Sequence, residues 1–125
     1  SLYAQIAQIN KVAKNTTIGY GQTVTLKNDS IIATISIGYS NGFSRLLSNK
    51  GTVYIRNKKL NILGRVSMDL TVIDISKFQY GEIKVGDIVE IFGPNRSLEK
   101  FAQENKTIPY EILSNMGKNI PKIIV

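Results

Sequence analysis

KVGDIVEIFG, residues 84–93, is the stretch that decides the fold. The Gly-Asp pair inside it makes a turn, and the residues that follow alternate as in a strand, with Glu90 on the face opposite Val89 and Ile91. A strand that follows so short a turn is typical of small antiparallel β-barrels. Many such barrels contain the same turn, so by itself it does not identify one family.

Similar runs recur on both sides of this strand. They are short, rich in isoleucine and valine, and separated by turns of Gly, Asn, Asp and Ser. We expect strands at 23–27, 31–37, 52–56, 60–62, 70–75 and 123–125. The fold class is therefore mainly β, a small antiparallel β-barrel-like domain with one or two short helices near the C-terminus.

The two ends of the chain depart from this pattern. Residues 2–13 have apolar spacings that fit a helix and a strand equally well, so both alternatives stay open. Near the other end, Ser97 is a candidate N-cap for a helix through Asn105, with Glu99 in its first turn. Thr107 is a candidate N-cap for a second helix.

Composition limits the possible chemistry. The 125 residues suffice for one domain with a real core. Cysteine and histidine are absent, which excludes disulfides and thiolate metal sites and removes the usual acid/base at neutral pH. No apolar run is long enough to span a membrane, and the start has no signal-peptide pattern and no methionine, so we interpret the chain as a fragment.

The formal net charge of +7 leaves a second function open, a small basic β-barrel binding module for nucleic acid or the ribosome. The lysines are scattered, however, and only Lys58 and Lys59 form an adjacent basic pair. The charge is therefore a weak indication, and we expect no nucleic-acid partner.

Four segments combine Gly or Pro with tyrosine or charged residues, as functional loops often do: GYG at 19–21, GYSNGFSR at 38–45, GRVSMD at 64–69 and IPYE at 108–111. Each also has an ordinary interpretation from spacing alone. Tyr20 fits a turn, Met68 fits a core, and Asp69 fits a strand end with Arg65 as its surface partner.

Taken together, these segments resemble the alanine racemase C-terminal domain in order and spacing. VGD at 85–87, TIPYEIL at 107–113 and IPKI at 120–123 belong to the same series, so the resemblance covers essentially the whole chain, 1–125. It implies a cytoplasmic bacterial enzyme that interconverts L-alanine and D-alanine for peptidoglycan, with pyridoxal 5′-phosphate (PLP) as electron sink.

The resemblance also implies partners. The family's enzymes carry an N-terminal (β/α)₈ barrel that holds the Schiff-base lysine, and two chains pair head to tail as a homodimer. That barrel is not in this chain. We therefore expect the domain to bind no PLP and to be inactive by itself.

The residue roles follow from the matched positions. The implied roles are catalysis for Tyr20, substrate binding for Met68 and Tyr39, a cofactor phosphate contact for Tyr110, and a polar entrance gate for Arg65, Arg45 and Asp69. Free tyrosine titrates near ~10, so a basic Tyr20 needs a neighbour that lowers its pKa. In the family, a barrel histidine backed by an arginine contacts this phenol.

Some positions depart from the family pattern. Asn41 stands where Asp is common, Ser67 where Cys is frequent, and Asn119 and Lys122 where arginine is frequent. Asn41 and Lys122 keep the shape of the usual residue but change its charge or hydrogen-bond geometry at the gate, and none of the four departures removes a tyrosine. A related racemase for serine or another amino acid shares the same site and stays open as an alternative.

Overall fold

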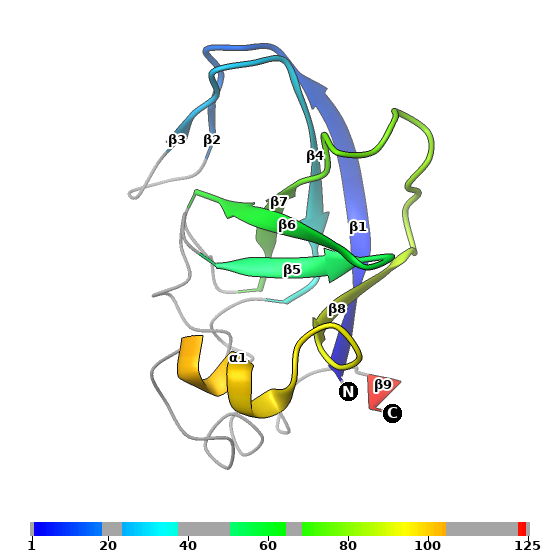
Figure 1. Ribbon diagram of the computed structural model, residues 1–125. Coiled ribbons are helices and arrows are strands. Elements are labelled where there is room, and N and C mark those ends of the chain that lie inside the picture. The colour runs from blue at the N-terminus through cyan, green and yellow to red at the C-terminus, as the bar shows by residue number, and fades with distance from the viewer. Residues whose placement is uncertain (1, 19–23, 38–50, 65–68, 105–122, 125) are drawn as a thin grey trace.

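The computed structural model describes residues 2–18, 24–37, 51–64, 69–104 and 123–124 (Figure 1). Its elements, in chain order, are β1 (Leu2–Val12), β2 (Thr17–Ile18), β3 (Val24–Thr25), β4 (Ser30–Ile35), β5 (Thr52–Ile55), β6 (Lys58–Leu63), β7 (Thr71–Asp74), β8 (Ile88–Phe92), α1 (Leu98–Glu104) and β9 (Ile123–Ile124).

Within the described ranges, seven strands form one antiparallel sheet in the order β4-β7-β6-β5-β8-β1-β9, and β2 and β3 form a separate hairpin. The sheet curls on itself because β4 also pairs with β1, from Ile6↔Ile35 to Val12↔Ser30. The closure is uneven, since Tyr54↔Glu90 is the pair that joins β5 to β8. The expected mainly β, barrel-like fold is confirmed in this irregular form.

The first segment, for which the sequence left two alternatives, is a strand. Strand β1 buries Leu2, Ala4 and Ile6, as alternation requires, and a register shift lies between Ile6 and Gln8. Its first half pairs with β8 and β9 and its second half with β4, so this long strand runs along the whole sheet (Figure 1).

The turn that opens KVGDIVEIFG is present and is bound to β1. Gly86 has φ 93°, a conformation that glycine adopts without a steric penalty. Its amide donates to the carbonyl oxygen of Ile6 at 2.8 Å, and the Ile6 amide donates to the carbonyl oxygen of Asp87 at 3.0 Å. The turn therefore fixes the start of β8 against the middle of β1.

Strand boundaries differ from expectation where turns intervene. β5 ends at Ile55 because Arg56 and Asn57 have φ of 49° and 69° and make a two-residue hairpin turn, after which Lys58 pairs with Ile55. The expected strand at 23–27 is present as the shorter β3, and the one at 31–37 ends at Ile35.

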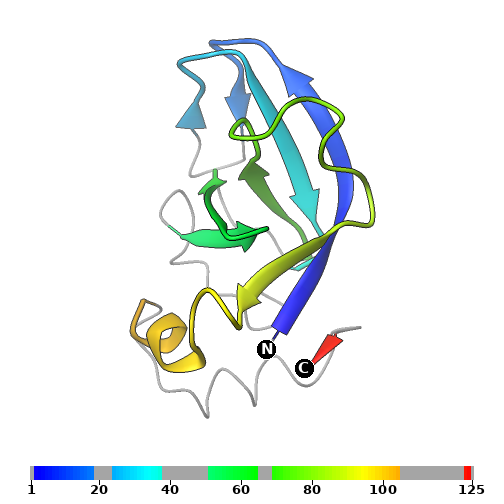
Figure 2. The same ribbon diagram turned by 45° about the vertical axis from the view of Figure 1, so that its right-hand side comes forward.

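The core fills the inside of the curled sheet with aliphatic side chains. Its members with less than 2% exposure include Ile6, Ile35, Ile37, Val53, Leu60, Ile62, Ile73, Val89 and Ile91. Helix α1 lies near the end of β8 (Figure 2). There the Phe101 ring lies 5.6 Å from that of Phe92. Burial of this kind stabilises the fold by about 25 cal/mol per Å² of apolar surface.

Helix α1 begins as predicted. The Ser97 side-chain oxygen accepts a hydrogen bond from the Lys100 amide at 3.1 Å, which is the N-cap contact, and Glu99 lies in the first turn. β9 corresponds to the strand expected at 123–125. The second helix, expected from Thr107, lies outside the described residues. No helix in the described part is long and apolar enough to cross a membrane.

Candidate active site

Most residues that the sequence nominated for chemistry lie outside the described part of the chain. These are Tyr20, Tyr39, Arg45, Arg65, Met68 and Tyr110, and so are the departures Asn41, Ser67, Asn119 and Lys122. Asp69 is described and exposed. The structure therefore describes the residues that flank the nominated segments. We call these flanking residues the site frame.

The segment 19–23, which carries Tyr20, is flanked by the β2–β3 hairpin. Ile18 pairs with Val24, and both belong to a small apolar cluster separate from the main core. The same cluster includes Leu63, at the end of β6. Leu63 and Gly64 directly precede 65–68. The residues that flank 19–23 and 65–68 are therefore packed together.

The segments 38–50 and 65–68 are flanked by residues that contact each other at both ends. At one end the Thr71 hydroxyl donates to the carbonyl oxygen of Ile37 at 2.7 Å. At the other end the Ile62 amide donates to the carbonyl oxygen of Gly51 at 2.9 Å. Ile37 and Thr71, which lie two residues before Tyr39 and three residues after Met68 in the sequence, are thus bonded to each other, although they are far apart along the chain.

A buried arginine joins this frame to helix α1. Arg96 is 2% exposed, and its guanidinium makes five hydrogen bonds, as many as it has N–H groups. They go to the carbonyl oxygen of Ile91 (3.2 and 2.7 Å), to the hydroxyl and carbonyl oxygens of Thr52 (2.8 and 2.6 Å) and to the Glu104 carboxylate (2.7 Å).

A second buried charge lies beside it. Glu90 is 6% exposed, and its carboxylate accepts hydrogen bonds from the Asn95 amide (2.8 Å), the Asn95 side chain (2.9 Å) and the Arg96 amide (3.2 Å). Buried charges persist only when such partners satisfy them. This network holds the connection between β8 and α1 in one conformation.

This network was not predicted from the sequence. Glu90 did stand as a carboxylate among apolar residues in KVGDIVEIFG, and that position is a signal of a satisfied buried charge. For Arg96 there was no comparable signal, because a single arginine after a turn has the pattern of a surface residue.

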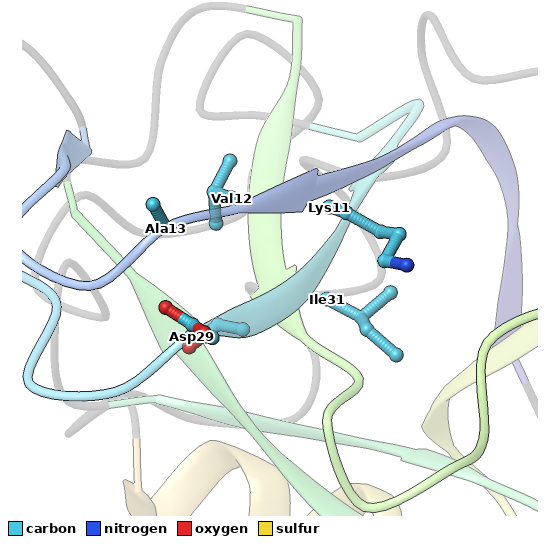
Figure 3. Close-up of a pocket in the computed structure, with 6 residues that line it drawn as sticks. Lys11, Val12, Ala13, Asp29 and Ile31 are labelled. Carbon is cyan, nitrogen blue, oxygen red and sulfur yellow. The ribbon is translucent and has the colours of Figure 1, made fainter.

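An open hollow of about 300 Å³ lies elsewhere on the sheet, where β1 pairs with β4 (Figure 3). Its lining residues are Lys11, Val12, Ala13, Asp29, Ser30 and Ile31. None of them is a nominated site residue, and one Asp29 oxygen already accepts a hydrogen bond from the Lys14 amide at 2.9 Å. Among the described residues, no cluster of three or more metal-ligating side chains occurs.

The described residues define a small, mainly β domain: a curled antiparallel sheet in which residues that flank the nominated segments contact one another. Residues 1–124 match the family described as alanine racemase, C-terminal domain, and the chain belongs to this family. The expected family is thereby confirmed, and the binding-module alternative is not favoured.

Two relatives illustrate the similarity in sequence. An alanine racemase of Brucella canis is 41% identical over 125 residues, covering 100% of this chain and 32% of that protein. An alanine racemase of Rickettsia bellii is 42% identical over 123 residues, covering 98% of this chain and 30% of that protein. The chain thus spans about a third of the length of these relatives.

Solved structures agree in fold. The alanine racemase of Bartonella henselae, solved with covalently bound pyridoxal phosphate, superposes with a TM-score of 0.86 at 41% identity, over 93% of this chain and 32% of that one. The biosynthetic alanine racemase of Pseudomonas aeruginosa gives a TM-score of 0.83 at 33% identity, over 95% and 33% of the two chains.

Proposed function

We propose that this domain forms part of a PLP-dependent alanine racemase and supplies Tyr20 as one of its two proton carriers. The observation that carries the proposal is the match to alanine racemases along the whole chain, at 41% identity for the Brucella canis protein. The proposed enzyme interconverts L-alanine and D-alanine for peptidoglycan in the cytoplasm. Its remaining part, an N-terminal (β/α)₈ barrel, holds the cofactor lysine.

The cofactor phosphate needs hydrogen-bond donors or cations from the protein. Both arginines in the described part already have hydrogen-bond or ion-pair partners within the domain. Arg96 donates to protein oxygens, and Arg56 lies 3.6 Å from the Glu82 carboxylate and 4.0 Å from that of Asp87. The chain's proposed phosphate donor, as its resemblance to the family implies, is the Tyr110 hydroxyl, whose chemistry suits a phosphate oxygen. Most of the cofactor's contacts must come from the barrel.

Racemisation requires a proton carrier on each face of the α-carbon, and each carrier must act as base and then as acid. PLP, when bound, supplies the electron sink that stabilises the charge left on that carbon. In the proposed enzyme the Tyr20 oxygen takes or returns the proton on one face, and the barrel lysine serves the other face.

Tyr20 needs a neighbouring group that lowers its pKa in order to act as a base. A phenol with an ordinary pKa near ~10 is almost entirely protonated at neutral pH. The family resemblance implies that a histidine lowers the pKa of Tyr20, and this chain contains none, so that group comes from another part of the protein. We assign it to the barrel of a second subunit, in a head-to-tail homodimer where each site combines one barrel with the partner's β domain.

The other nominated residues bind and select the substrate. The backbone amide of Met68 donates to the alanine carboxylate, so an apolar side chain is compatible with a binding site. The Tyr39 ring narrows the entrance to favour a methyl side chain, and Arg65, Arg45 and Asp69 form a polar gate outside it. Rates with serine and other amino acids, measured beside alanine, test this selection.

The decisive variant is Tyr20→Phe in the complete protein that contains this domain. We expect the rates of both L-to-D and D-to-L conversion to fall by about 10²–10⁴-fold, the usual contribution of one acid/base group. The rates are followed by chiral chromatography, together with solvent deuterium incorporation at the α-carbon.

Tyr80→Phe is the matched control. Tyr80 is 62% exposed, and its ring lies under the Lys11 ammonium at 4.7 Å, a contact that phenylalanine retains. We expect this variant to racemise alanine at the unmodified rate. Two-way racemisation that survives in Tyr20→Phe would remove the catalytic assignment, whereas an inactive unmodified protein would remove the proposed function itself.

A further inference from the structure

We infer that Arg96 is a positioning residue that fixes, relative to each other, the residues flanking the substrate-entrance segment (38–50) and the cofactor-phosphate segment (105–122). The inference rests on the proposed function. It is carried by the partners of one buried side chain, which lie next to two of the nominated segments and come from positions distant in the sequence.

The first partner lies at the end of the entrance segment. Thr52 is the first residue of β5 and follows 38–50, which contains Tyr39 and Arg45, by one residue. Arg96 contacts it twice, through the hydroxyl at 2.8 Å and the carbonyl oxygen at 2.6 Å. A two-point contact fixes both the place and the orientation of the backbone from which the entrance segment extends.

The second partner lies at the start of the phosphate segment. Glu104 is the last residue of α1 and directly precedes 105–122, which contains Tyr110. Its carboxylate lies 2.7 Å from the Arg96 guanidinium, with side-chain exposures of 33% for Glu104 and 1% for Arg96. A charge-assisted bond at the last turn determines where the chain leaves the helix.

Ring contacts restrict the guanidinium further. It lies 4.9 Å from the Phe101 ring of α1 and 5.3 Å from the Tyr54 ring of β5. Together with the bonds to the Ile91 carbonyl oxygen, these contacts leave it one orientation. Helix α1 and strand β5 therefore cannot shift relative to each other without breaking several contacts of Arg96 at once.

Only arginine can perform this role. A planar guanidinium directs its N–H groups to several acceptors in fixed directions, whereas a lysine ammonium has three donors at a single point. Arg96→Lys keeps the charge but cannot serve Thr52, Ile91 and Glu104 together. Arg96→Met keeps much of the apolar stem and removes every donor.

The test uses the complete protein, at a temperature where circular dichroism shows each variant folded. We expect Arg96→Met to raise both the KM for alanine and the dissociation constant of PLP by about ten-fold, the scale of a small misplacement in an active site. Arg96→Lys should give a smaller change in both. PLP binding is measured by its absorbance after dialysis, independently of turnover.

Phe78→Leu is the matched control for loss of stability. Phe78 is 4% exposed and lies under the Lys58 ammonium at 4.8 Å. Lys58 pairs with Ile55, at the end of β5 opposite Thr52. A core truncation there lowers the melting temperature without touching the Arg96 network. Its KM and PLP dissociation constant should stay within about two-fold of the unmodified values.

Two milder variants separate the two sides and serve if Arg96→Met does not fold. Thr52→Val removes one acceptor on the entrance side, and we expect it to raise the KM for alanine while PLP binding is unchanged. Glu104→Gln weakens the contact on the phosphate side, and we expect it to weaken PLP binding while KM changes less.

The outcomes are distinct. Arg96→Met with the KM and PLP affinity of Phe78→Leu, or milder variants that alter neither quantity, overturns the positioning role and leaves the proposed function intact. An unmodified protein that neither binds PLP nor racemises alanine overturns the proposed function and the positioning role with it.

Discussion

Replacing Thr71 by valine removes one hydrogen bond from the site frame and keeps the shape of the side chain. Thr71 is 1% exposed, and its hydroxyl donates to the carbonyl oxygen of Ile37 at 2.7 Å, near the optimum for a bond between oxygens. This bond links the start of β7 to the residue that precedes 38–50. Thr71→Val therefore tests whether the frame depends on side-chain contacts between strands.

The magnitude follows from the burial of both partners. A lost intramolecular hydrogen bond costs about 1 kcal/mol, and a buried carbonyl left without its donor raises the cost toward ~3 kcal/mol. The added methyl group offsets about 0.8 kcal/mol through apolar burial. Because Thr71 and Ile37 are each 1% exposed, the cost lies in the upper half of that range. We therefore expect a net loss of about 1–2 kcal/mol, which corresponds to a roughly 5–30-fold rise in the population of the locally open state.

Amide hydrogen exchange of the complete protein, followed by mass spectrometry, measures this change. Peptides that cover 30–37 and 69–75 should exchange roughly 5–30-fold faster in Thr71→Val. Thr25→Val is the control, because Thr25 is exposed and its hydroxyl lies 3.4 Å from that of Thr17. Equal protection in the two variants would show that the Thr71 bond does not stabilise the frame.

Two further variants probe the turn and the helix cap. Gly86→Ala should lower the free energy of unfolding by about 1–2 kcal/mol, because φ 93° is strained for a residue with a Cβ. No atom lies within 4 Å of the added Cβ, so the loss comes from the backbone conformation. Urea denaturation measures the loss, and an unchanged midpoint would contradict it. Ser97→Ala removes the hydrogen bond from the Lys100 amide and should lower the stability of helix α1 by about 1 kcal/mol. We expect faster amide exchange confined to 98–104. Unchanged exchange there would show that the cap does not stabilise the helix.

Predictions that depended on local chemistry agree with the structure. The turn in KVGDIVEIFG and the Ser97 cap each depend on residues a few positions apart, and both were readable from the chain. The strand end at Ile55 was misplaced because a left-handed turn can include an arginine such as Arg56, which propensity does not single out. The alternatives for 2–13 were settled by pairing, since β1 gains its partners from β4 and β8.

The candidate site was likewise predicted only in part from the sequence. Its nominated residues came from the order of the motifs, and those roles stay predictions, because only Asp69 among them lies in the described part. Its frame was not foreseen. The contacts of Thr71 with Ile37 and of Arg96 with Thr52 join positions 34 and 44 residues apart, and nothing in either local pattern indicates the partner.

The sequence by itself determined what each short stretch could become: alternating strands, turns at Gly and Asn, a capped helix, and a series of motifs that places the chain in its family. Tertiary structure alone decided which strands meet and which charges are buried. The pairing of β4 with β1 closes the sheet, and α1 then covers Arg96, so that a residue with an exposed pattern becomes a buried one. The physical reason is that burial depends on surfaces brought together from distant parts of the chain, whereas turns and caps depend on the dihedral angles and donors of a few neighbouring residues.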